Sequence, residues 1–145
     1  MFADECGSTL KTTVVKTWAS TGETPTIQSK LNWQSVSIIA GLSSAGHLLQ
    51  RTYEHSIKAP QVVEFLEHVL AHIPGDVIVV LDRAKVHRAK LVKASVDTQP
   101  RLTLEYLPGD APECNLVAWF WASIKCHVLG NVCFRNIREL NMRWR

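Results

Sequence analysis

The chain has 145 residues, of which 46% are hydrophobic and 20% charged, a balance typical of one soluble globular domain. No hydrophobic run approaches the roughly 18–20 residues of a membrane span, and the first residues lack a signal-peptide pattern, so we expect a cytoplasmic protein without a membrane partner. The net charge of +3 is uneven: residues 1–75 carry 5 basic and 6 acidic side chains, and residues 76–145 carry 11 and 7. This excess is compatible with a phosphate-bearing partner but does not identify one.

The first half of the chain has strand patterns and no convincing helix before residue 59. Residues 1–4 are apolar and predict a short first strand, which a polar segment rich in Ser and Thr follows. The run 36–44 predicts a buried strand. The turn at 44–46 joins it to the partly alternating run 47–57, so we expect a hairpin.

From residue 59 the hydrophobic period becomes that of a helix. Residues 59–73 place their apolar side chains on one stripe, with Pro60 in the first turn, and predict a helix. The apolar run 76–82 predicts a central strand covered on both faces. The remaining patterns predict a basic helix over 83–95, a strand over 101–107, and helices over 115–128 and 134–145. Antiparallel strands followed by βαβ crossovers indicate an α/β domain.

Two carboxylates lie where such a sheet places its chemistry. Asp82 closes the apolar strand, and Asp4 lies in the first strand. If these strands are neighbours, the two carboxylates face each other and repel unless a cation lies between them. Mg²⁺ suits such oxygen ligands, and two ions about 4 Å apart can activate water and stabilise the leaving oxygen of a phosphodiester. The alternatives are ordinary: Asp82 could be a helix N-cap, and Asp4 a surface residue near the terminus.

Several motifs occur in the order of a known family: FADE at 2–5, TWASTGETP at 17–25, VVLDRAKVH at 79–87 and LPGDAPECNLVAWFWASIK at 107–125. Together they resemble the catalytic domain of the DDE transposases of the mariner-like insertion-sequence superfamily. The resemblance implies a ribonuclease H-like fold, in which helices flank a mixed five-stranded sheet of order 3-2-1-4-5. It also implies one catalytic domain over residues 1–145, without the helix-turn-helix DNA-binding region and part of the first strand that family members carry.

The resemblance assigns the first two metal-binding acids to Asp4 and Asp82, which in the family hold two Mg²⁺ or Mn²⁺ ions. The third acid position falls on Ala118, with 35 residues between it and Asp82, so the spacing is kept and the carboxylate is missing. No later acid is a good replacement, because Glu113 precedes the predicted helix and Glu139 lies beyond it. Further matches to the family motifs are Ala84, His87, Pro112, Glu113, Asn115 and Trp121, whereas Arg83 replaces the usual Asn.

A basic cluster follows Asp82 and consists of Arg83, Lys85, Arg88, Lys90 and Lys93. A solvated helix face is the ordinary interpretation. Contacts to DNA phosphates are the other, and closeness to the expected metal site favours them. Trp119, Phe120 and Trp121 could stack on bases, but three consecutive side chains cannot share one helix face, so we expect two of them to pack in the core.

We therefore expect a transposase catalytic domain for metal-dependent DNA strand cleavage and strand transfer of an insertion sequence, impaired or inactive because of Ala118. Its expected partners are DNA, as element ends and target, and a second copy or another transposase subunit; a bacterial protein would be nucleoid-associated. One alternative is a non-catalytic remnant that binds DNA or a partner. A phosphorylation-receiver-like domain with Asp82 as acceptor is disfavoured, because residues 10–58 lack the helices that receivers alternate with strands.

Overall fold

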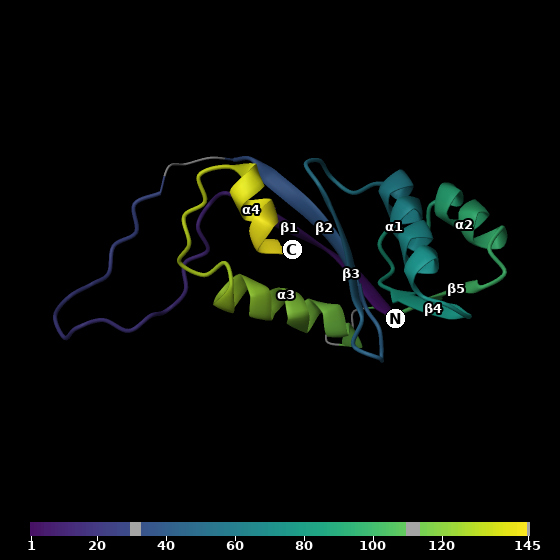
Figure 1. Cartoon of the computed structure of the whole chain (residues 1–145), viewed down its shortest axis with the longest axis horizontal. Coiled ribbons are helices and arrows are strands. Elements are labelled where there is room, and N and C mark those ends of the chain that lie inside the picture. Colours follow the sequence, from purple (N-terminus) through teal and green to yellow (C-terminus); the bar gives the residue numbers. More distant parts are fainter. Residues whose placement is uncertain (30–32, 110–113, 145) are drawn as a thin grey trace.

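A mixed five-stranded sheet forms the centre of the fold (Figure 1). The computed structural model describes residues 1–29, 33–109 and 114–144. The sheet order is β3-β2-β1-β4-β5, which confirms the predicted order, and the strands are β1 (Phe2–Thr9), β2 (Ser35–Leu42), β3 (Leu48–Tyr53), β4 (Val77–Leu81) and β5 (Leu102–Tyr106). Strand β2 is antiparallel to both β1 and β3, whereas β4 runs parallel to both β1 and β5.

Two helices pack on each face of the sheet, as Figure 1 shows. The helices are α1 (Ala59–His72), α2 (Lys90–Asp97), α3 (Leu116–His127) and α4 (Ile137–Trp144). Two separate hydrophobic clusters result, one beneath α1 and α2 and the other beneath α3 and α4. None of these helices is long and apolar enough to cross a membrane.

Strand β1 contributes to both clusters because successive side chains of a strand point to opposite faces. Ala3 is buried with α1 and α2, and Cys6 is buried with α3 and α4. By the same alternation Asp4 points toward the α3 face and Glu5 toward the α1 face. The strand is eight residues long, longer than the expected run 1–4, and it pairs with β2 over its whole length.

The predicted helix over 83–95 is wrong in its first half. Helix α2 begins only at Lys90, with Ala89 as its N-cap, and residues 82–89 form a loop with a turn at 85–88. The physical reason lies in two polar side chains: the Asp82 carboxylate accepts a hydrogen bond from the Ala84 amide at 2.9 Å, and His87 is completely buried. Such side-chain contacts compete with helical hydrogen bonds. The other predicted helices and strands after residue 35 are confirmed, with ends shifted by a few residues.

The described part of the connection between β1 and β2, residues 10–29, projects away from the rest of the molecule (Figure 1). Its base is held by Asn131, whose side chain bonds the backbone N–H and carbonyl of Val15, each at 3.0 Å. The backbone N–H of Asn131 also donates to the Thr13 carbonyl at 2.8 Å. Beyond this anchor Trp18 is 99% exposed. The segment is thus fixed at its base and presents a large apolar side chain to solvent.

Candidate metal-binding site

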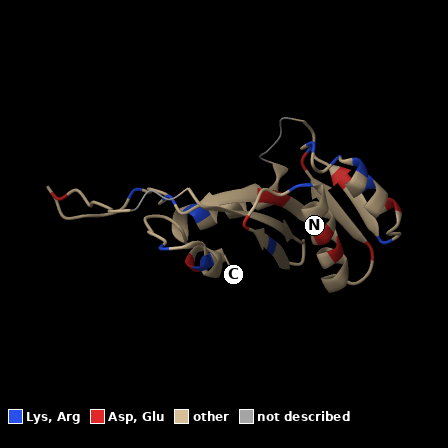
Figure 2. Cartoon of the chain, turned by 90° about the horizontal axis from the view of Figure 1, so that it is seen from above, with Lys and Arg blue, Asp and Glu red and all other residues tan. Residues whose placement is uncertain are grey.

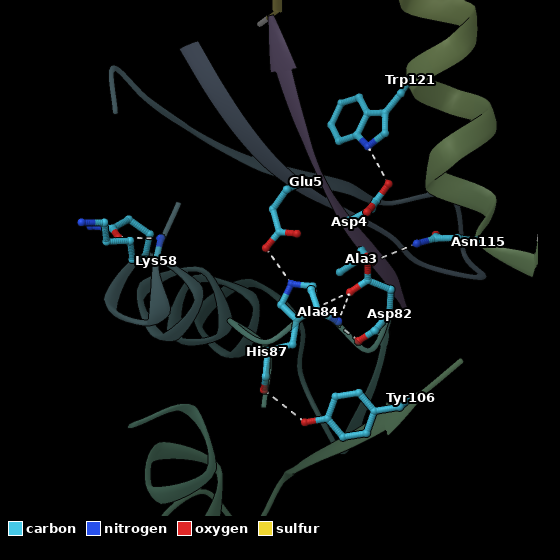
Figure 3. A network of polar contacts seen from close by, with 11 residues as sticks. Ala3, Asp4, Glu5, Lys58, Asp82, Ala84, His87, Tyr106, Asn115 and Trp121 are labelled. Carbon is cyan, nitrogen blue, oxygen red and sulfur yellow. Dashed lines mark hydrogen bonds and ion pairs between the residues drawn. The ribbon is translucent and has the colours of Figure 1, made fainter. Parts of the chain in front are cut away.

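Asp4 lies on β1, and Asp82 directly follows β4, the strand that pairs with β1, as the sequence predicts. Phe2 on β1 is paired with Val80 on the parallel strand β4. The amide of Val80 donates to the Met1 carbonyl at 2.8 Å, which anchors this register. Asp4 follows two residues later on β1 and Asp82 two residues later along the other segment, and Figure 3 shows both side chains at this end of the two strands. They are close enough for the charge of Asp82 to raise the pKa of Asp4. The parallel pairing thus brings together two acids that are 78 positions apart in the sequence.

The Asp4 carboxylate lies against helix α3. Its Oδ2 accepts a hydrogen bond from the indole Nε1 of Trp121 at 3.1 Å. Burial, with a smaller contribution from the charges of Glu5 and Asp82, raises the pKa of Asp4 to about 6, although hydrogen bonds from the Glu5 backbone and Trp121 act in the opposite direction. Asp4 is therefore a carboxylate whose negative charge is not compensated by its surroundings.

The Asp82 carboxylate is held at one oxygen. Its Oδ1 accepts from the Ala84 amide at 2.9 Å and lies 2.7 Å from Nδ1 of His87. The side chain is half exposed, so its other oxygen has access to solvent. Since the N-cap of α2 is Ala89, the interpretation of Asp82 as a helix cap is wrong.

His87 connects the two faces of the sheet. Its Nε2 lies 2.6 Å from Oε1 of Glu5, and its Nδ1 faces Asp82. Burial alone lowers the pKa of His87, but the hydrogen bond and charge of Glu5, together with Asp82, outweigh it and raise the pKa above its ordinary value. The hydroxyl of Tyr106 also donates to the His87 carbonyl at 3.1 Å. The family motif includes His87, but the sequence did not identify Glu5 as its partner. Alternation along the first strand, which turns Glu5 to the face opposite Asp4, could have indicated this contact.

Helix α3 is fastened to β1 on both sides of position 118 (Figure 3). Asn115, its N-cap, accepts from the Val117 amide at 3.1 Å and donates to the Ala3 carbonyl at 3.3 Å. Trp121 contacts Asp4 on the other side. Trp121 is buried and Phe120 packs against the same cluster, while Trp119 is 67% exposed, so two of the three aromatics pack in the core as expected. Pro112 and Glu113 lie outside the described residues.

The five residues of the basic cluster differ in how they are held. Arg83 is tied down, because its Nε donates to the Leu107 carbonyl at 2.9 Å. The other four basic side chains are exposed, two on the loop before α2 and two on its first turn. Figure 2 shows that basic positions at the α1 and α2 end of the molecule are interspersed with acidic ones. The cluster is therefore accessible to an anionic partner without being a uniformly positive face.

The two carboxylates fit a hard divalent cation, which prefers oxygen ligands. A cation between them would also relieve the repulsion that contributes to the raised pKa of Asp4. Within residues 1–29, 33–109 and 114–144, no three or more Asp, Glu, His or Cys side chains are arranged to hold a metal ion. The carboxylates are thus the type of ligand that suits a divalent cation, but the described residues bring together two of them and not three.

The sheet order and the two flanking helical layers define a ribonuclease H-like α/β fold. The family model of the DDE superfamily endonucleases matches residues 1–141, and the chain belongs to this family. A search of curated proteins gave no match.

Solved structures of similar fold include Mos1 transposase assemblies. The pre-cleavage Mos1 transpososome is 15% identical with a TM-score of 0.72, and the Mos1 paired-end complex with the left transposon end is 18% identical with a TM-score of 0.68. Each match covers 97% of this chain and 45% of the Mos1 chain. The simian T-cell lymphotropic virus intasome, in complex with PP2A regulatory subunit B56 gamma, is 8% identical over 85% of this chain and 36% of the other, with a TM-score of 0.58. This chain thus spans less than half the length of these proteins.

Proposed function

We propose that this chain is the catalytic domain of a transposase that cleaves and joins the DNA strands of an insertion sequence, with activity impaired at Ala118. The observation that carries the proposal is that Asp4 on β1 and Asp82, directly after the paired strand β4, come from neighbouring segments of the sheet in a member of the DDE family. Similar folds have been solved as a Mos1 strand transfer complex and as Mos1 paired-end complexes with Mn and with Mg. These support DNA as the partner and Mg²⁺ or Mn²⁺ as the cofactor.

In the proposed mechanism, Asp4 and Asp82 hold the cation through their carboxylate oxygens. A cation held there would supply the Lewis acid that activates water and stabilises the leaving oxygen of a phosphodiester. Trp121 orients the Asp4 carboxylate, and the Ala84 amide and His87 orient that of Asp82. Position 118 would supply the third acid of the family, and Ala118 supplies none, so the cation would be held on two sides only. We propose weak or absent cleavage for this reason.

A Mn²⁺ titration tests the metal site. We expect the wild-type chain to bind Mn²⁺ weakly, and Asp82→Asn to lower the affinity at least about 10-fold, because it removes one of two anionic ligands. Asp76→Asn is the matched control, since Asp76 is an exposed acid that precedes β4. Paramagnetic resonance of free Mn²⁺ or calorimetry gives the affinity. Equal Mn²⁺ affinities in the wild type and Asp82→Asn would refute the proposed site.

DNA binding tests the accessible part of the basic cluster. We expect Lys90→Ala with Lys93→Ala to weaken binding to duplex DNA independently of sequence, and to reduce the slope of log K against log salt by about 2, because each phosphate contact releases counterions. The double variant Lys11→Ala with Lys16→Ala, at the other end of β1, removes the same charge as a control. Fluorescence anisotropy over a series of salt concentrations measures the slope. An unchanged slope would show that these lysines only solvate the surface of α2.

A second transposase subunit is the other partner that we propose. The projecting connection between β1 and β2 supports this proposal, because it is anchored at Asn131 and exposes Trp18. Large exposed aromatic side chains are typical of surfaces that contact another protein. For location we propose the cytoplasm, in association with the nucleoid if the source is bacterial.

A further inference from the structure

A continuous polar chain crosses the sheet from Glu5 through His87 to Asp82 (Figure 3). The two links are 2.6 Å and 2.7 Å long, and the imidazole between them is completely buried. Burying a polar ring between two carboxylates costs desolvation energy, and an apolar side chain of similar volume often gives equal or greater stability. Stability alone therefore does not explain why these three polar side chains occupy this part of the core. Their contacts bear directly on Asp82.

The effect of these contacts on Asp82 is to fix the orientation of the carboxylate. The Ala84 amide donates to Oδ1, and Nδ1 of His87 lies 2.7 Å from the same oxygen and 3.2 Å from the backbone carbonyl of Asp82, while the side chain as a whole stays half exposed. Glu5 in turn holds the imidazole ring through Nε2. A ring fastened at both nitrogens cannot turn, so the position of Asp82 depends on an acid that it does not touch.

Glu5 itself is in the wrong place to replace the missing third acid. It points toward the α1 face of the sheet, whereas Asp4 points toward α3. Its Oε1 is also engaged by His87. Any influence of Glu5 on a cation at Asp4 and Asp82 must therefore pass through the imidazole.

We propose that Glu5 and His87 are positioning residues that hold Asp82 in its metal-binding orientation. The proposal rests on the proposed function of Asp82 as a metal ligand. It extends the site to the opposite face of the sheet, and it gives the acid directly after Asp4 a role separate from that of Asp4. Partners behind metal ligands commonly set the affinity of the site, with changes of about 10- to 100-fold on mutation.

The test compares Mn²⁺ affinities of the wild type, Glu5→Gln, His87→Gln and the double variant. Glutamine preserves the volume of Glu5, and at position 87 its amide occupies the place of Nε2 while losing the donor to Asp82. We expect each single variant to bind Mn²⁺ about 10-fold more weakly. The double variant should be no weaker than His87→Gln alone, since Glu5 acts only through the ring. His87→Asn, whose amide replaces Nδ1, should retain more affinity than His87→Gln.

A second measurement needs no metal. The carboxyl ¹³C resonance of Asp82 reports its hydrogen bonding, and we expect Glu5→Gln to shift it while the resonance of Asp97 stays unchanged. The proposal would be overturned if Glu5→Gln left both the Mn²⁺ affinity and this resonance unaltered. It would also be overturned if Glu5→Gln lowered the Mn²⁺ affinity as much in the His87→Gln background as in the wild type. If the wild type and Asp82→Asn bind Mn²⁺ equally, the proposed function fails, and the Asp82 resonance alone then decides for or against the positioning role.

Discussion

Ala118→Glu is expected to raise the affinity for Mn²⁺ on the order of 10- to 100-fold, because a direct anionic ligand contributes at least as much as the partners behind one. Position 118 is half-buried and lies between two contacts of α3 with β1, those of Asn115 with Ala3 and of Trp121 with Asp4. It is about 60° around the helix from Trp121, which points at Asp4. A carboxylate there would become the third acid of the site, and metal-dependent nicking of DNA should become detectable.

The matched control is Ala122→Glu, which adds the same charge to an exposed position of α3. Without metal, Ala118→Glu should lower the melting temperature by bringing a third acid to two that already repel each other. Saturating Mn²⁺ should reverse this loss, because a ligand that binds only the folded state stabilises it. A folded Ala118→Glu protein with the Mn²⁺ affinity of the wild type, or an equal gain in Ala122→Glu, would mean that position 118 does not face the site. The non-catalytic remnant would then be the better proposal.

Asp4→Asn is expected to stabilise the metal-free protein at pH 7.5. The pKa of Asp4 is raised from 3.8 to about 6, so the folded state holds this proton more tightly than the unfolded state does. The stabilisation that this proton provides is complete below pH 3.8, falls as the pH rises, and is lost above about pH 6. The full shift corresponds to about 3 kcal/mol, and solvent screening of this partly exposed group reduces the expected gain to about 1–2 kcal/mol. Denaturant unfolding of both proteins measures it.

The difference between the two proteins should vanish below pH 4, where Asp4 is protonated in both states of the wild type. It should also shrink in saturating Mg²⁺, which stabilises the wild type and not Asp4→Asn. Trp121→Phe provides an independent check, because it removes the indole donor that lowers the pKa of Asp4 and should move the transition to higher pH. A stability gain that is the same at pH 4 and pH 7.5 would show that the charge of Asp4 is not its cause.

The strand order and the adjacency of Asp4 and Asp82 could be predicted from the sequence. The apolar run 76–82 predicts a strand, and the ordered motifs indicate its parallel neighbour; both are confirmed. The expectation that this strand is covered on both faces is wrong, because Ile78 is 55% exposed and the buried residues of β4 lie on one face. The sequence predicts helix α2 too early, because its basic and apolar residues already follow a helical period from residue 83. Periodicity does not reveal that His87 is completely buried or that Asp82 bonds the Ala84 amide, and these contacts delay the helix to Lys90.

The amino-acid sequence by itself determined the order of strands and helices, the two acids that we propose as metal ligands, and that position 118 carries no charge. These properties are local, because they depend on hydrophobic period, turn residues and motif spacing along one stretch of chain. Only the tertiary structure decided that Glu5 contacts His87 across 82 positions, that Trp121 donates to Asp4, and that burial gives Asp4 a raised pKa. Those properties arise from burial and from distances between elements, which exist only after the sheet has brought β1, β4 and α3 together.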